Sequence, residues 1–425
     1  MIEDIKPITD RPVTSEQTKI QEPQASPATS EAEEVSPEVP ESKYDLDIDE
    51  NNEPVSSSVN TDNGNELKPR GKRSMKDRLK AAWPPSRKGW VVIVLVILVI
   101  GGITGYALTR STPKKLYVAK LRVPTVPVSK YVPSTLSGLP VDPNINKIPV
   151  TGVMIENSDF ARPQSGLSSA GVVFEAIAEG GITRFLALYQ DTAPTNVGPI
   201  RSARPYYEQW ALGFDASLAH VGGSPEALAD IKSWGVKDLD QFYNSAYYHR
   251  VSTRAAPHNV YTGIATLNQA EATKNFISTK FTGFPRKVEA PSKVPTARSI
   301  NLAISGPDFA VHYDYAATSN SYNRSEASAP HIDANTNKPI SPKVVIAMVI
   351  PYSLEADGYH SDYTVIGSGQ AYIFQDGIVQ IGQWTKSAAA SQIAFKTSGG
   401  QTITLNPGQT WITAVSGSGN ISYTP

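Results

Sequence analysis

The feature that most constrains this chain is an uncharged apolar run, WVVIVLVILVIGGITGYAL, at residues 90–108. As an α-helix these 19 residues would extend about 28 Å, which is close to the hydrocarbon thickness of a bilayer. A buried core helix is the alternative, but a helix at the edge of a core keeps a polar face and this run has none. A cleaved signal peptide would not follow a preamble of more than 80 residues. The run therefore predicts one transmembrane helix.

The segments before the apolar run carry opposite charges. Residues 1–67 hold 17 acidic and four basic side chains, a composition that buries too little apolar surface to offset the entropy of ordering. Residues 70–88 hold eight Lys or Arg and one Asp, and positive charge beside a membrane helix favours the cytoplasmic side. We therefore expect an acidic disordered cytoplasmic tail at 1–69, a basic juxtamembrane segment at 70–89 and, at the cell membrane, an extracytoplasmic chain beyond the helix.

The remainder of the chain divides into segments that differ in composition and in the pattern of their apolar residues. Residues 109–146 repeat proline and predict an extended extracytoplasmic tether. Residues 147–283 alternate strand-like and helix-like segments, and residues 284–300, rich in Pro, Lys and Ser, predict a linker. Residues 301–425 are short β-branched segments separated by Gly, Asn and Pro. The predicted fold class is α+β, with a mixed strand/helix first domain and a smaller mostly-β second domain behind one transmembrane helix.

Composition excludes several kinds of site. Residues 147–425 hold 20 basic and 21 acidic side chains, so their bulk charge offers nothing to nucleic acid. The chain has no cysteine, which removes disulfides, thiolate metal ligands and a lipidated cysteine. The six histidines show no H-E-x-x-H or similar spacing. We expect no metal site and no cofactor.

Gly180-Gly181 separates two apolar strand-like runs within residues 171–190 and predicts a tight β-hairpin. A two-residue turn fixes a register with the pairs Glu179–Ile182, Ile177–Arg184 and Glu175–Leu186. Because side chains alternate between the faces of a strand, Glu175, Glu179 and Arg184 are expected on one face of the sheet.

Arginines also precede a predicted helix directly after this hairpin. The segment GPIRSARPYY (198–207) leads into a helix expected over 205–214 with Pro205 in the favoured first position. Arg201 and Arg204 would therefore lie at a strand-to-helix junction, where backbone N–H groups favour anions.

Two later segments repeat this arrangement. HVGGSPEAL (220–228) places His220 before a helix capped by Ser224. RAAPHNVY (254–261) places Arg254 before, and His258 at the start of, a helix expected over 257–274.

Three interpretations of these residues stay open. In the first, the arginines pair with Glu156, Glu175 and Glu179 and hold loops together. In the second, they converge on a pocket for a carboxylate or phosphate. The candidate ligand-binding residues are Arg162, Glu175, Glu179, Arg184, Arg201, Arg204, His220, Arg254 and His258. In the third, Glu156, His220 or His258 acts as a catalytic acid–base, although no nucleophile motif accompanies them.

Several of these segments together resemble a known family. TGVMIEN (151–157), residues 161–190, VGPIRSARPYY (197–207), HVGGSPEAL (220–228) and PHNVY (257–261) resemble the YerB-like family of bacterial envelope proteins, domain of unknown function 3048. The resemblance continues through GSGQAYIFQDGIVQIGQWTK (367–386) and ITLNPGQTWI (403–412). The positions that match the family's motifs are Glu156, Asn157, Arg162, Pro163, Gln164, Glu175, Glu179, Arg184, Arg201, Arg204, His220 and His258.

The resemblance implies two family domains, at 147–283 and 301–425, in a bacterial protein commonly tethered as a lipoprotein. This chain lacks the lipidated cysteine, so the apolar helix would replace the lipid. The resemblance implies no established activity.

We therefore expect a membrane-anchored extracytoplasmic bacterial protein that binds an anionic envelope component, a wall polymer or peptidoglycan, through an Arg/Glu pocket. Its expected partners are the cell membrane and a wall polymer or envelope protein. The alternatives are a wall-acting hydrolase or transferase with a Glu or His acid–base, and an adaptor that docks envelope enzymes.

Overall fold

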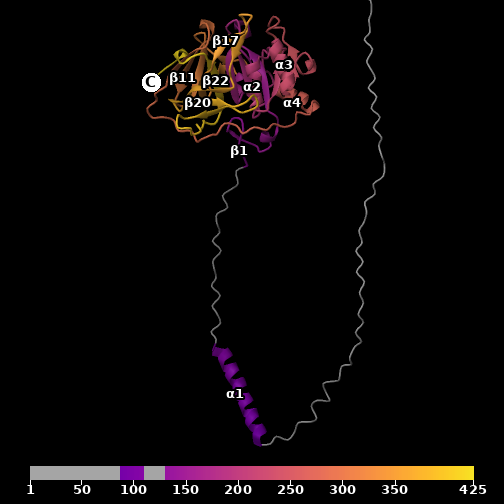
Figure 1. Cartoon of the computed structure of the whole chain (residues 1–425), viewed down its shortest axis with the longest axis vertical. Helices are drawn as coiled ribbons and strands as arrows, with labels where there is room; N and C mark the ends of the chain where they lie inside the picture. Colours follow the sequence, from indigo (N-terminus) through magenta and orange to yellow (C-terminus); the bar gives the residue numbers. More distant parts are fainter. Residues whose placement is uncertain (1–86, 110–129) are drawn as a thin grey trace, which may run out of the picture. The chain divides into compact units, whose positions relative to one another are not determined.

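The computed structural model describes residues 87–109 and 130–425 (Figure 1). The predicted acidic tail, and most of the predicted juxtamembrane segment and tether, lie outside these ranges. The apolar run is helical within α1 (Arg87–Thr109). Among the described residues, no helix has both the length and the apolar character needed to span a membrane. The transmembrane assignment therefore stays a prediction from the sequence.

The globular part is built on a ten-stranded mixed sheet with the order β21-β20-β19-β16-β22-β4-β5-β3-β6-β7. Its first five strands in chain order are β3 (Thr151–Glu156), β4 (Val172–Glu179), β5 (Ile182–Tyr189), β6 (Ser217–His220) and β7 (Lys237–Asp240). Its other five are β16 (Val344–Val349), β19 (Gly367–Gln375), β20 (Ile378–Lys386), β21 (Ala394–Lys396) and β22 (Thr410–Val415). β4 pairs in parallel with β22, so one sheet runs through both predicted domains.

A second sheet of five strands has the order β13-β12-β11-β10-β23. Its strands are β10 (Ser299–Ala303), β11 (Ala310–Ala316), β12 (Ser321–Glu326), β13 (Ala329–Pro330) and β23 (Ile421–Thr424). The paired short strands are β1 (Val132–Pro133) with β2 (Pro140–Val141), β8 (His249–Arg250) with β9 (Val260–Tyr261), β14 (Ile332–Asp333) with β15 (Lys338–Pro339), and β17 (Tyr352–Leu354) with β18 (Ser361–Tyr363). The structure thus combines few helices with many strands.

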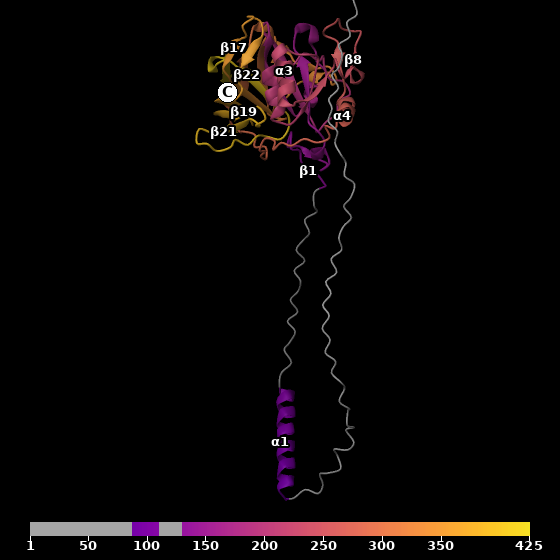
Figure 2. The same ribbon diagram turned by 45° about the vertical axis from the view of Figure 1, so that its right-hand side comes forward.

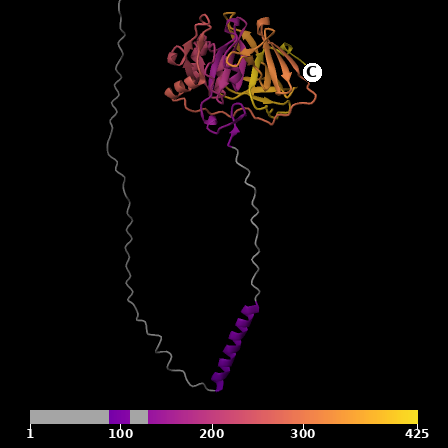
Figure 3. The ribbon, with the colours of Figure 1, turned by 180° about the vertical axis from the view of Figure 1, so that it is seen from behind.

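Three helices accompany the strands of the first half: α2 (Pro205–Leu212), α3 (Pro225–Trp234) and α4 (Ile264–Thr273). Figure 1 shows α3 and α4 toward one end of the globular part and β11 and β20 toward the other, and the turned view in Figure 2 labels β8 on the same side as α4. The view from behind shows the same separation of the two halves by colour (Figure 3).

The two faces of the large sheet are covered differently at β4. On one face Trp210 of α2 stacks on Phe174, with ring centroids 4.9 Å apart. On the other face Arg324 of β12 lies 2.8 Å from Glu175. We call these the α2 face and the β12 face. The tryptophans Trp210, Trp384 and Trp411 are all buried, so none of these rings presents a surface for stacking on a sugar.

Most local signals in the sequence are confirmed. α2 begins at Pro205, and α3 begins at Pro225 after Ser224, whose hydroxyl accepts a hydrogen bond from the Ala227 N–H. The predicted Gly-Gly turn forms at 180–181, and an Asp-Gly turn at 376–377 joins β19 to β20. The helix predicted over 257–274 begins only at Ile264, because the residues before it form β9, which pairs with β8.

The register predicted for the Gly-Gly hairpin is wrong beyond its first pair. A β-bulge between Ile177 and Glu179 changes the pairing to Ala176 with Arg184 and Glu175 with Phe185. A bulge inserts one extra residue into one strand, which moves every residue beyond it to the opposite face. Glu175 therefore lies on the β12 face, whereas Glu179 and Arg184 share the α2 face.

Candidate functional site

The structure distributes the predicted site residues over four places instead of one cleft. Glu179, Arg184 and Arg204 form one group on the α2 face. Glu156, Arg201, Arg254 and His258 form a second group at the end of β3. Glu175 and Arg162 belong to a network on the β12 face, and His220 lies apart from all of them.

Glu179 joins two arginines in a closed triad. Arg184 Nη2 lies 2.5 Å from one carboxylate oxygen and Arg204 Nη2 lies 2.6 Å from the other. Burial would raise the pKa of Glu179, but the two guanidiniums outweigh that effect and hold the pKa below its ordinary value. Each arginine also donates to a backbone carbonyl of the 202–203 loop. The triad therefore fastens the loop before α2 to the hairpin and matches the scaffold interpretation.

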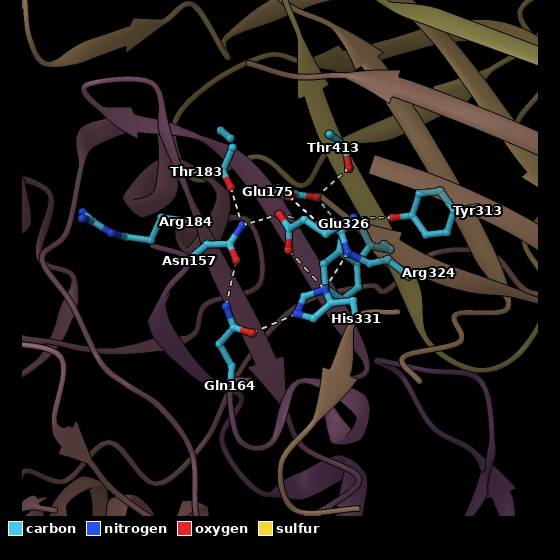
Figure 4. Close-up of polar contacts among 12 residues, drawn as sticks. Asn157, Gln164, Glu175, Thr183, Arg184, Tyr313, Arg324, Glu326, His331 and Thr413 are labelled. Atoms are coloured by element: carbon cyan, nitrogen blue, oxygen red, sulfur yellow. Dashed lines mark hydrogen bonds and ion pairs between the residues drawn. The ribbon is translucent and has the colours of Figure 1, made fainter. Parts of the chain in front are cut away.

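Glu175 is the acceptor at the centre of the network on the β12 face (Figure 4). It accepts hydrogen bonds from Arg324 Nη2 at 2.8 Å, Trp411 Nε1 at 2.9 Å and Thr413 Oγ1 at 3.2 Å. All four side chains are buried. Burial would lower the pKa of Arg324, but Glu175 and its other neighbours raise it above its ordinary value. Arg324 is not among the residues predicted from the sequence, because its segment SYNRSE (321–326) is polar apart from Tyr322 and gives no local signal for a buried guanidinium.

The same network continues through amide groups to Asn157, which directly follows β3 (Figure 4). Asn157 Nδ2 donates to Thr183 and to Glu326, both at 2.6 Å. Arg324 Nε donates to Nδ1 of His331 at 2.8 Å. Burial holds the pKa of His331 well below its usual range, so the ring is neutral and donates from Nε2.

The Nε2–H group of His331 makes the last hydrogen bond of this network. His331 Nε2 lies 2.9 Å from Gln164 Oε1. At the edge, Arg162 lies 3.4 Å from Glu326 and donates to the Asp308 carbonyl at 2.8 Å. Glu175 and Arg162 thus join the two halves of the molecule and do not line the group at the end of β3.

His220 is fully committed to structural contacts. Its Nε2 lies 3.0 Å from Asp238 and its Nδ1 lies 2.8 Å from the Gly222 carbonyl. The Gly222 N–H donates to the Asp240 carboxylate at 3.0 Å. The sequence predicts that N–H groups of the loop before α3 are available to an anion. In the structure the Gly222 N–H is not available, because it already donates to Asp240.

Glu156 and His258 form the centre of the group at the end of β3. His258 Nδ1 lies 2.8 and 2.9 Å from the two carboxylate oxygens of Glu156. Glu156 is 3% exposed, and it also accepts from the Ser158 hydroxyl at 2.8 Å. Arg201 Nε approaches the same carboxylate at 3.4 Å. A carboxylate in this position fixes the orientation of the imidazole ring and its tautomer.

A cavity of about 440 Å³ opens beside His258 and is lined by Phe160, Thr253, Arg254, Ala255 and His258. Arg254 is held at this cavity because its guanidinium donates to the backbone carbonyls of Phe160 and Pro163, the latter at 2.8 Å. The Phe160 ring lies 5.3 Å from the His258 ring and is 75% exposed.

Arg254 is the arginine that lines this cavity, and Arg201 and Glu156 lie behind His258. Within residues 130–425 no hydrogen bond or ion pair involves Nε2 of His258. A neutral ring that donates from Nδ1 to Glu156 presents a lone pair at Nε2, and a protonated ring presents an N–H donor there. This group, which we call the Glu156–His258 site, can therefore receive an anion or exchange a proton.

Comparison with known proteins places these residues in a family. Residues 136–277 match the family model described as "Protein of unknown function (DUF3048) N-terminal domain", and residues 300–412 match the corresponding C-terminal domain. YerB of Bacillus subtilis (strain 168), a candidate lipoprotein by its name, is 30% identical over 293 residues, which cover 68% of this chain and 87% of YerB.

A solved structure supports the same relationship. The crystal structure of YerB from Bacillus subtilis matches with a TM-score of 0.63 at 28% identity and covers 69% of this chain and 100% of that one. The chain belongs to the DUF3048 family, of which YerB is a member.

Proposed function

We propose that this chain is an envelope-associated protein that binds an anionic group of an envelope component in the cavity of the Glu156–His258 site. The observation that carries the proposal is the pairing of Arg254 and His258 at one cavity, with Arg201 and Glu156 behind them. Arg254 donates to two backbone carbonyls and also interacts with the Tyr261 hydroxyl, and its remaining N–H groups could donate to a carboxylate or phosphate.

The proposed location follows from the family and from the apolar run. YerB is named as a candidate lipoprotein, and residues 90–108 of this chain would replace a lipid as the anchor. We propose a single-pass membrane protein with its N-terminus in the cytoplasm and residues 130–425 outside. A wall polymer or peptidoglycan would then lie within reach of the cavity.

Cosedimentation of the detergent-solubilised full chain with purified sacculi tests this function. Arg254→Gln removes a charge at the cavity, and Arg250→Gln removes one from an exposed residue of β8 that does not line it. We expect at least a fivefold loss of retention for Arg254→Gln and none for Arg250→Gln. Equal retention of both variants and the parent would remove the proposal.

A second candidate function is acid–base catalysis on wall material, and the contact between Glu156 and His258 Nδ1 favours it. A carboxylate that orients a histidine, whose other nitrogen is available, is a common arrangement for general-base catalysis. Release of soluble fragments from sacculi by the parent, lost in His258→Asn and in Glu156→Gln, would support this function. Retention without any release would support binding alone.

A further inference from the structure

The turn between β17 and β18 brings together three metal-ligating side chains from one short stretch of sequence, LEADGYH. One ligand atom each from Glu355, Asp357 and His360 lies within 4.8 Å of the other two. We propose that these residues bind a divalent transition-metal ion, with Zn²⁺ as the preferred probe. This site is separate from the Glu156–His258 site and does not depend on its function.

The backbone of the turn fixes two of the three donors. The N–H groups of Tyr359 and His360 both donate to Asp357 Oδ1 at 2.9 Å. His360 Nδ1 then lies 2.5 Å from the other oxygen, Oδ2. The backbone of Glu355 pairs with that of His360, with the N–H of Glu355 donating to its carbonyl at 2.8 Å. Glu355 is thereby held directly across the turn from the imidazole, and a metal ion would replace the proton shared by His360 and Asp357.

The surroundings of the turn favour a cation. In the described part of the chain, no Lys or Arg makes an ion pair with Glu355, nor with Glu226 of α3 or Asp362 of β18. These carboxylates act on one another: burial raises the pKa of Glu226, and the charge of Glu355 is the next largest cause. The negative charge beside the turn is therefore not neutralised by the protein itself.

The donor set indicates the kind of metal. Mg²⁺ and Ca²⁺ prefer oxygen ligands, whereas an imidazole with carboxylates suits Zn²⁺ and its neighbours in the first transition row. Three protein donors leave a fourth position for water or a substrate atom, as in catalytic zinc sites. Motifs based on histidine spacing do not include this set, because it contains a single histidine.

The turn between β17 and β18 is hydrogen-bonded to the tip of the β4–β5 hairpin. The Gly180 N–H donates to the Tyr359 carbonyl at 2.9 Å, and Glu179 and His360 form a β-bridge. A metal ion would therefore fix the turn of the second family segment on the tip of the β4–β5 hairpin of the first.

Calorimetric titration of the tag-free, detergent-solubilised full chain with ZnCl₂ tests the proposal. We expect one site per chain whose affinity falls at least tenfold in His360→Asn and in Glu355→Gln. The matched control is His312→Asn, because His312 also pairs with an aspartate, Asp314 at 3.0 Å, and has no third ligand in reach among the described residues. This control should keep the affinity of the parent.

Thermal melting provides an independent readout for the same variants. Zn²⁺ should raise the melting temperature of the parent and of His312→Asn but not that of His360→Asn, because only a ligand bound to the folded state stabilises it. The proposal is overturned if the parent binds no Zn²⁺, or if both site variants bind it as tightly as the parent does.

Discussion

At the scale of single residues, four glutamates of the first family segment differ in what surrounds their carboxylates. Glu175 and Glu179 are saturated by arginine and hydroxyl or indole donors on opposite faces of the sheet. Glu156 holds a histidine at a cavity. Glu208 of α2 is buried, and neither of its carboxylate oxygens has a hydrogen-bond partner among the described residues. The partners, and not the residue type, decide which of these positions can act on a ligand.

Neutralising Glu175 tests whether the network on the β12 face is a scaffold. Among the described residues, Glu175→Gln leaves the buried guanidinium of Arg324 with only Glu326, at 3.4 Å, as a carboxylate partner. Removing one partner of a buried ion pair costs about 3–5 kcal/mol, so we expect a loss of that size in the free energy of unfolding, measured by denaturant titration. A loss below about 1 kcal/mol would show that Arg324 does not depend on this carboxylate.

The isolated carboxyl of Glu208 predicts a pH dependence. Burial, with the charges of Asp230 and Glu226, raises the pKa of Glu208 from 4.5 to about 9. Because the folded state binds this proton more tightly than the unfolded state, the protein loses stability as the pH rises from 4.5 toward 9. At about 1.4 kcal/mol per pH unit this amounts to roughly 3 kcal/mol at pH 7.

The variant Glu208→Gln should remove this dependence. We expect it to match the parent at pH 5 and to exceed the parent's free energy of unfolding at pH 7, by up to roughly 3 kcal/mol. Denaturant titrations at the two pH values measure both quantities. Equal stability of parent and variant at pH 7 would contradict the raised pKa.

At the scale of elements, the sequence correctly predicts the helix starts and turns that depend on neighbouring residues alone. The proline and serine at the starts of α2 and α3 and the Gly-Gly turn each act through neighbouring residues. The bulge in β4 could not be predicted in this way. It depends on β5 on one side and β22 on the other, which is more than 200 positions away in the sequence. The separation of Glu175 from Glu179 and the role of Arg324 follow from these distant contacts.

Gly180 of the Gly-Gly turn and Gly358 of the turn between β17 and β18 should lose different amounts of stability when they are replaced by alanine. Gly180 has a φ of 55°, and a Cβ there would lie 2.8 Å from the Tyr359 ring. Gly358 has a φ of 68° but no atom within 4 Å of such a Cβ. Gly358→Ala should cost about 1 kcal/mol from the left-handed backbone alone, and Gly180→Ala should cost more because the ring must move. Melting temperatures decide this, and an equal fall for both variants would mean that Tyr359 yields without cost.

At the scale of the whole molecule, the sheet joins the two family segments. Five of its strands come from each segment, and the parallel pair of β4 with β22 lies at its centre. The two family models match residues 136–277 and 300–412 separately, but because one sheet includes strands of both segments we expect the two segments to unfold together.

Fluorine NMR of the chain labelled with 5-fluorotryptophan tests this cooperativity. Trp210 reports on the first segment and Trp384 on the second, and both are buried. We expect the two native signals to disappear with the same urea midpoint, because unfolding of either segment exposes the edge of a central strand. Separate midpoints would show that each segment folds as its own unit.

Binding of an anion at the Glu156–His258 site can be observed directly by ¹⁵N NMR of the histidine side chains during titration with inorganic phosphate. We predict a saturable shift of the His258 Nε2 signal, absent in Arg254→Gln, while His249, which is exposed on β8 and does not line the cavity, stays unchanged. No saturable shift of His258, or an equal shift of His249, would contradict the proposed anion site.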